Sequence, residues 1–139
     1  MLSYQNYADN DSLYNTPPVF AIYMVNKTLH WINAQGGVKA IAARNREKAQ
    51  LIYNVIDASR GFYRGHAEKA SRSLMNITFN LPTQELEKDF IAEGKKRGFI
   101  GIGGHRLVGG CRVSAYNAVT PEACRALADF MKEYQAKHE

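Results

Sequence analysis

One short stretch gathers most of the residues that are suited to holding a small anion. Residues 103–113 carry four glycines, two arginines and one histidine, and the chain then continues into Ser114–Asn117. Glycine lets a backbone approach a ligand closely, and arginine offers a rigid fork of donors that matches a carboxylate or a phosphate. The stretch is therefore a candidate oxyanion site with His105, Arg106 and Arg112 as donors. Two tight turns at the glycine pairs explain the same spacing equally well.

A second group of possible anion donors lies near the start of the chain, in Asn15-Thr16-Pro17-Pro18. This sequence predicts a helix start, with Thr16 as N-cap and Pro17 in the first turn. Helix N-termini attract phosphate through free N–H groups and the helix dipole, and Asn15 and Thr16 add side-chain donors. Helix capping alone accounts for both residues and is the simpler interpretation.

The elements that must position these residues follow from periodicity and turn signals. We expect a helix from Thr16 to a stop at Gly36-Gly37, with an inward stripe at Val19, Ile22, Val25, Leu29 and Ile32. The further expected elements are helices at 38–58, 84–97 and from 121, and strands beginning at 62 and spanning 73–81, 99–102 and 111–116. This order predicts an α+β fold, a small antiparallel or mixed sheet with helices on one face.

Several side chains have an expected environment. In the helix at 38–58, the solvated side is expected to hold Arg44, Arg46, Glu47 and Lys48. Strand alternation places Cys111, Val113 and Ala115 on one face and Arg112, Ser114 and Tyr116 on the other. On that polar face, the residues of the glycine stretch are placed to converge with Arg112.

Composition limits the class of protein. The chain has 139 residues, a formal net charge of +5 and two cysteines, Cys111 and Cys124, which we expect to be buried free thiols. Free thiols indicate a reducing compartment, so we expect a cytoplasmic protein. No apolar run is long enough to span a bilayer and no secretory signal is visible, so we expect no membrane partner. The basic residues are scattered, and clustered basic and stacking aromatic residues are missing, which argues against a nucleic-acid partner.

The chemistry in the sequence is that of binding. No nucleophile with a neighbouring base, phosphate-binding glycine loop or metal-ligand motif is visible. The residues alone therefore predict an α+β domain with a possible anion site, no catalytic residue and no metal.

Four segments, in order, resemble the phosphoserine aminotransferase family. They are 15–18 (Asn-Thr-Pro-Pro), 36–38 (Gly-Gly-Val), 72–79 (Arg-Ser-Leu-Met-Asn-Ile-Thr-Phe) and 104–118, and the resemblance covers about Leu2 to His138. It implies a transaminase that depends on pyridoxal phosphate (PLP), has the type I aminotransferase fold and acts in serine biosynthesis. The family exchanges an amino group between glutamate and 3-phosphohydroxypyruvate, giving 2-oxoglutarate and 3-phosphoserine. By resemblance, residues 1–14 are a linker and 15–139 the C-terminal small domain of such an enzyme.

The resemblance also assigns roles to the candidate residues. The family works as a homodimer with active sites at the subunit interface. Asn15 and Thr16 match residues that hold the cofactor phosphate of the neighbouring subunit. His105 and Arg106 match a loop that binds the substrate's phosphate or distal carboxylate, and Arg112 matches the arginine that grips the α-carboxylate.

One part of the family pattern is missing. The family's lysine that forms the Schiff base with PLP lies well upstream of Asn-Thr-Pro-Pro, whereas the fourteen residues before Asn15 contain no lysine. Lys27, Lys39 and Lys48 follow the motif and do not match it. We therefore expect a small-domain fragment that is inactive alone and binds PLP weakly or not at all. The alternative is a free-standing, non-catalytic anion-binding or regulatory domain derived from the enzyme.

Overall fold

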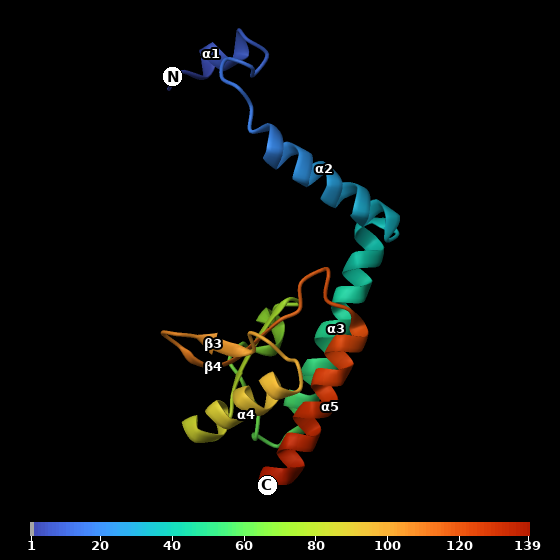
Figure 1. Cartoon of the computed structure of the whole chain (residues 1–139), viewed down its shortest axis with the longest axis vertical. Coiled ribbons are helices and arrows are strands. Elements are labelled where there is room, and N and C mark those ends of the chain that lie inside the picture. The colour runs from blue at the N-terminus through green and yellow to red at the C-terminus, as the bar shows by residue number, and fades with distance from the viewer. Residues whose placement is uncertain (1) are drawn as a thin grey trace. The chain divides into compact units, whose positions relative to one another are not determined.

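The computed structural model describes residues 2–139, and the chain forms two compact units that divide between Ala40 and Ile41 (Figure 1). The first unit contains α1 (Tyr4–Ala8), α2 (Val19–Ala34) and the first residues of α3 (Gly37–Ala58). The second unit contains the rest of α3 and everything that follows. Because the division falls inside 15–139, the small-domain bounds stay a prediction.

The helix α2 begins later than predicted. Its N-cap is Pro18, with no side-chain cap, so Thr16 is not the N-cap residue. The consecutive prolines explain the difference, since a residue that precedes proline is kept out of the helical region, and Pro17 precedes Pro18. The stop at Gly36-Gly37 is confirmed, because both glycines have positive φ, +92° and +76°.

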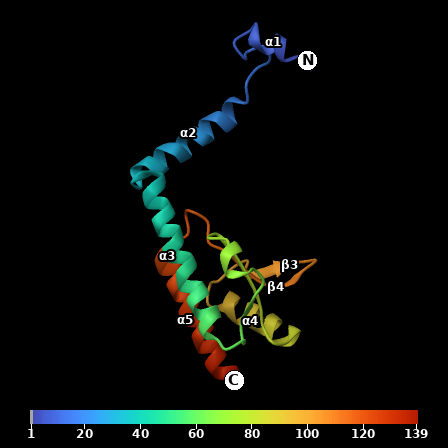
Figure 2. The ribbon, with the colours of Figure 1, turned by 180° about the vertical axis from the view of Figure 1, so that it is seen from behind.

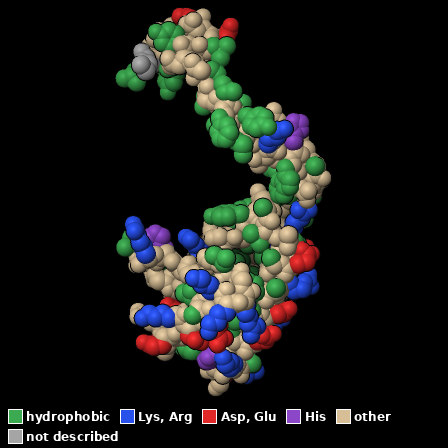
Figure 3. All heavy atoms as spheres, in the orientation of Figure 1, with side chains coloured by type: hydrophobic (Ala, Val, Ile, Leu, Met, Phe, Trp, Pro, Cys, Tyr) green, Lys and Arg blue, Asp and Glu red, His purple; other side chains and the backbone are tan. Residues whose placement is uncertain are grey.

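None of the residues of α2 is buried within the described chain. The expected inward stripe is therefore exposed, and so are apolar side chains on the other faces of the helix, which include Phe20, Tyr23, Met24 and Trp31. Figure 3 shows apolar side chains, in green, along the visible face of this helix. The first half of the helix, 19–25, is apolar on all sides, a pattern that is typical of a buried position in a larger structure.

The second unit is built on a four-stranded antiparallel sheet with the order β1-β2-β4-β3. The strands are β1 (Arg64–Gly65), β2 (Asn76–Asn80), β3 (Gly103–His105) and β4 (Gly109–Ser114), and a short 3-10 helix, η1 (Lys69–Ser71), follows β1. In the centre of the sheet, Ile77 pairs with Val113 and Thr78 pairs with Arg112. The α+β class predicted from the sequence is confirmed.

Three helices cover one face of this sheet. They are α3, α4 (Gln84–Lys96) and α5 (Pro121–His138), and α3 and α5 lie side by side in both views (Figures 1 and 2). As predicted, Thr83 caps α4 by accepting from the Leu86 N–H, and Thr120 caps α5 by accepting from the Ala123 N–H. The residues predicted to form the core face, Cys111 and Val113 of β4 and Ala115 just after it, are buried under these helices.

The core of the second unit is aromatic and centres on Phe90 of α4, which is 0% exposed. Its ring lies 4.9 Å from that of Phe130 and 5.1 Å from that of Tyr134, measured between centroids. Two further rings, those of Tyr63 and Phe79, lie at 6.0 Å. The central position of Phe90 therefore joins α4 and α5 to the sheet.

Three strand predictions need correction. The predicted strand at 99–102 is wrong, because Gly101 has a φ of +76° and pairing begins only at Gly103. The strand predicted from Ser73 begins at Asn76, since the Ser73 hydroxyl accepts from the N–H groups of residues 75 and 76 and forms a turn. Residues 62 and 63 are buried core residues that precede β1.

The prediction that Lys48 is solvated is also wrong, because this lysine is 0% exposed. Helical periodicity placed it on the polar side of α3, next to Glu47. Its ammonium instead lies inside the second unit and donates to two backbone carbonyls, those of Ala115 and Tyr116.

The segment that leads into β2 is fixed to α3 by Arg72. The Arg72 guanidinium donates two hydrogen bonds to the Asp57 carboxylate, at 2.9 and 2.6 Å, and lies over the Tyr53 ring. These hydrogen bonds lower the pKa of Asp57. The Tyr53 hydroxyl in turn donates to the Ser73 carbonyl, so α3 sets where β2 begins.

Candidate anion-binding site

The hairpin formed by β3 and β4 carries three of the candidate residues. His105 pairs with Gly109, and residues 106–108 form the turn between the strands. The His105 carbonyl accepts from the Val108 N–H at 2.9 Å, and its ring Nδ1 accepts from the Leu107 N–H at 3.3 Å. Arg106 is exposed at the tip, where nothing in residues 2–139 pairs with its side chain. The turn thus holds two basic side chains together on a short projection.

The glycines of the hairpin serve close contact between strands. A Cβ on Gly104 would lie 1.9 Å from the Gly109 carbonyl oxygen. A Cβ on Gly110 would lie 2.8 Å from the Phe79 carbonyl oxygen, and Gly110 has a φ of +68°. Gly103 and Gly104 are therefore strand residues, and the interpretation of this pair as a tight turn is wrong.

This contact predicts the effect of a single methyl group. Replacing Gly104 by Ala should separate β3 from β4, because the new Cβ would meet backbone atoms that have no rotamer with which to move away. Amide hydrogen exchange should become at least about tenfold faster in Gly109–Cys111, with the α3 and α5 amides unchanged. Gly103→Ala is the matched control, since Gly103 lies in the same strand, has no positive φ, and would place its Cβ at an ordinary contact distance, 3.6 Å, from the Ile91 Cδ1. Equal effects of the two substitutions would contradict the prediction.

Arg112 lies on the sheet face opposite the helices. It pairs with Thr78, and its backbone N–H donates to the Ile102 carbonyl at 2.9 Å. Its side chain is half-buried, and its Nε is buried without a hydrogen-bond partner in the described chain. Nearby, the hydroxyls of Ser114 and Tyr116 donate to the Asn76 side-chain oxygen, each at 3.3 Å. This polar face presents a guanidinium that its own chain leaves incompletely paired, which suits a carboxylate.

The structure groups His105 with Arg106 but not with Arg112. Both hairpin residues line a hollow of about 360 Å³ beside α4, together with Glu87 and Lys88. Arg112 does not line this hollow. The hairpin donors and Arg112 therefore do not line one common hollow, and their convergence on a ligand stays a prediction.

Asn15 and Thr16 belong to the first unit and are exposed. The Asn15 side-chain amide donates to the Tyr7 hydroxyl at 2.8 Å. Thr16 lies three residues before the first residue of α2, Val19, so its hydroxyl is not used for capping. Both side chains supply donors of the kind that bind phosphate.

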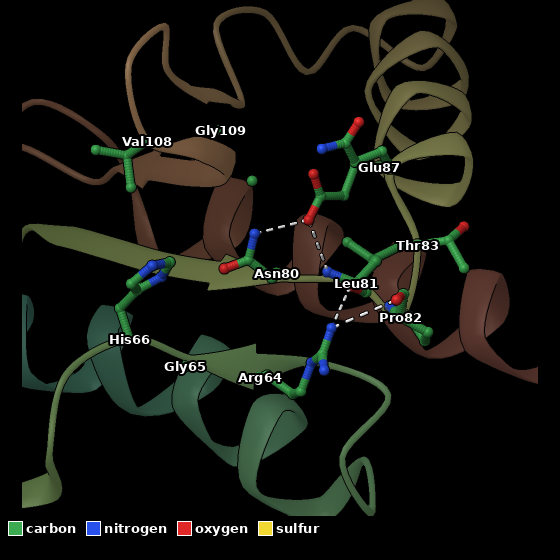
Figure 4. A pocket seen from close by; sticks show the side chains of 12 residues that line it. Arg64, Gly65, His66, Asn80, Leu81, Pro82, Thr83, Glu87, Val108 and Gly109 are labelled. Atoms are coloured by element: carbon green, nitrogen blue, oxygen red, sulfur yellow. Dashed lines mark hydrogen bonds between the residues drawn. The ribbon is translucent and has the colours of Figure 1, made fainter.

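Sequence reasoning gave no role to a hollow of about 510 Å³ that lies where β2 meets α4 (Figure 4). There the Arg64 guanidinium donates to the Leu81 and Pro82 carbonyls, at 2.9 and 3.4 Å. The Glu87 carboxylate accepts from the Asn80 amide and the Leu81 N–H, at 2.7 and 3.3 Å. These polar groups join the strand to the helix. No sequence pattern marks them, because the partners are set by the sheet.

Other kinds of site find no support in the described part of the chain. No group of three or more possible metal ligands occurs in residues 2–139. No helix there is long and apolar enough to cross a bilayer. Cys111 and Cys124 are free and buried, as predicted, and burial raises the pKa of the Cys111 thiol to about 12. This site is thus defined by cationic and hydrogen-bonding side chains.

The fold and this set of donors match one protein class. The family model "Aminotransferase class-V" matches residues 1–127, and the chain therefore belongs to the class-V aminotransferase family, whose members depend on PLP. Within the family it is similar to proteins named phosphoserine aminotransferase. It is 59% identical over 137 residues to that of Geobacillus kaustophilus (strain HTA426), and 54% identical over 139 residues to that of Bacillus subtilis (strain 168).

Solved structures agree with the sequence comparison. Phosphoserine aminotransferase from Bacillus circulans subsp. alkalophilus superposes with a TM-score of 0.89 at 52% identity, over 98% of this chain. The PLP-bound enzyme from Trichomonas vaginalis gives 0.81 at 37% identity, over 93% of this chain. The chain spans only 38% of the length of the Geobacillus protein and 37% of the Trichomonas structure.

Proposed function

We propose that the chain supplies the small-domain half of a phosphoserine aminotransferase active site. The reaction transfers an amino group between L-glutamate and 3-phosphohydroxypyruvate, giving 3-phosphoserine and 2-oxoglutarate. The observation that carries the proposal is Arg112, which stands on the open face of the sheet with a buried, unpartnered Nε. The 59% identity to an enzyme of that name supports this choice of substrates.

The separation of the basic groups supports distinct roles for them. Both substrate pairs carry an anion at each end, a carboxylate at one end and a phosphate or second carboxylate at the other. Arg112 binds the α-carboxylate, and His105 with Arg106 binds the distal anion. His105 and Arg106 line a hollow that Arg112 does not line, which leaves each set of donors available to its own anion.

The residues of this chain fit PLP only in part. Asn15 and Thr16 offer an amide and a hydroxyl for a phosphate, and we assign them to the cofactor of the neighbouring subunit in a homodimer. The buried lysine, Lys48, is committed to two backbone carbonyls. When bound, PLP acts as the electron sink of the reaction. We therefore propose that 15–139 acts as the small domain, that the chain alone neither turns over substrate nor holds PLP covalently, and that its buried thiols suit the cytoplasm.

The test restores the missing part of the enzyme. The region of the Geobacillus kaustophilus relative that precedes the matched segment is fused to this chain. We expect the fusion to transaminate 3-phosphohydroxypyruvate with glutamate, and the 139-residue chain alone to show no turnover. Borohydride should fix PLP to the fusion and not to the isolated chain.

Two results would contradict the proposal. A folded fusion that holds PLP but prefers an uncharged keto acid would exclude the proposed substrates. Stoichiometric fixation of PLP onto a lysine of the isolated chain would exclude its proposed inactivity. The unfused Geobacillus enzyme serves as the positive control for both measurements.

A further inference from the structure

Two buried polar side chains of α3 face the segment that follows β4. Lys48 is 0% exposed, and its Nζ donates to the Ala115 carbonyl at 3.0 Å and to the Tyr116 carbonyl at 2.7 Å. Asn45, 5% exposed, donates from its amide to the Asn117 side-chain oxygen at 2.8 Å. Residues 115–117 are thus attached to α3 by three hydrogen bonds.

This segment needs donors from outside the sheet. The pairing of β4 with β2 ends at Ser114, opposite Asn76, and the Ala115 N–H makes one further bond, to the Met75 carbonyl at 2.7 Å. Ala115 is 0% exposed, so water cannot serve its carbonyl oxygen. A buried carbonyl without a donor is costly, and a lysine ammonium carries three donors at one point. Lys48 fulfils this need for two consecutive carbonyls.

The fixed segment begins three residues after Arg112. Nothing in the described chain pairs with the Arg112 Nε, so the direction of its guanidinium depends on the backbone of β4. That backbone is held on one side by the bond from the Arg112 N–H to the Ile102 carbonyl, and beyond its end by Lys48. Resting on the proposed function of Arg112, we propose that Lys48 is a positioning residue that sets the direction in which Arg112 meets the substrate carboxylate.

The charged surroundings of Lys48 guide the choice of variants. Burial lowers the pKa of Lys48, and Arg44 lowers it further, whereas Cys124 raises it. Lys48→Met keeps a similar length and removes every donor. Lys48→Gln keeps an uncharged donor and serves as the second variant if the methionine variant does not fold. Lys39→Met is the matched control, because Lys39 is an exposed lysine of the same helix.

The first measurement uses the 139-residue chain and needs no substrate. We expect Lys48→Met to shift the NMR signal of the Arg112 Nε–H and to speed its hydrogen exchange by about tenfold. Lys48→Gln should fall between the methionine variant and the original chain, and Lys39→Met should leave the signal in place. An unchanged signal in the folded Met or Gln variant would overturn the proposal.

The second measurement separates positioning from stability in the active fusion. We expect Lys48→Met to raise KM for glutamate and for 3-phosphohydroxypyruvate by roughly tenfold and to change kcat by less than about threefold. A lower melting temperature with unchanged KM values would overturn the proposal, since Lys48 would then serve stability alone. If the unsubstituted fusion is inactive, the proposed function fails, while the NMR measurement still tests the attachment.

Discussion

Replacing Arg112 by Met in the fused enzyme should lower kcat/KM at least about 100-fold, which corresponds to about 3 kcal/mol of lost transition-state stabilisation. The guanidinium is half-buried and has one unpaired N–H of its own, so a bound carboxylate would be its main partner. Removing it leaves that carboxylate without a bidentate, charged donor. Arg112→Lys keeps the charge and loses the fork, and should recover only part of the activity.

Steady-state kinetics with both substrates checks this prediction. Arg125→Met provides the matched control, because the Arg125 side chain is 59% exposed and its one ion pair within residues 2–139 is a long one, 3.7 Å, with Glu47. We expect this control to keep kcat/KM within about twofold. If Arg112→Met leaves kcat/KM unchanged, Arg112 does not bind the substrate carboxylate. The proposed function would then rest on the similarity to known enzymes and no longer on this residue.

Replacing Phe90 by Ala should lower the free energy of unfolding of the second unit by about 3–5 kcal/mol. The Phe90 ring is 0% exposed and contacts aromatic rings from α5, from β2 and from the segment before β1. Removing the ring leaves a cavity that the neighbouring rigid rings cannot fill by small movements. The lost burial of the ring and the remaining cavity therefore both lower the free energy of unfolding.

Urea unfolding of the isolated chain, followed by far-ultraviolet circular dichroism, measures this loss. Phe20→Ala is the control of equal chemistry, since Phe20 is 76% exposed on α2, and it should change the midpoint by no more than the equivalent of about 0.5 kcal/mol. If both substitutions give equal midpoints, the aromatic cluster does not hold the second unit together.

The parts of the fold that follow from short-range signals could be predicted. Thr83 and Thr120 cap their helices because an N-cap needs only a side chain and an N–H a few residues away. The alternation of β4 was also correct, since Cys111 and Val113 are buried and Arg112 lies on the other face. These features depend on residues that are close in sequence, so they can be recognised in the sequence without knowledge of the fold.

What depends on distant partners could not be predicted. The strand at 99–102 is absent because pairing with β4 begins at Gly103, and pairing cannot be read from one segment alone. Lys48 is buried because carbonyls 67 and 68 residues further on need a donor. The positions of the anion donors also depend on the sheet, since His105 lies at the end of β3 whereas Arg112 pairs with Thr78 of β2. The stripe on α2 was correctly identified as apolar, but none of the residues of this helix is buried.

The exposed apolar surface of α2 has a consequence for the choice of buffer. The helix carries one lysine, Lys27, and no acidic residue, so the net charge of +5 that keeps copies of the chain apart resides almost entirely elsewhere. Salt screens that repulsion within about 10 Å at 0.1 M, and sulfate or phosphate also strengthens apolar association. Self-association of the isolated chain should therefore increase with ionic strength, which makes dilute, low-salt buffer the condition in which its NMR spectrum reports on a single copy.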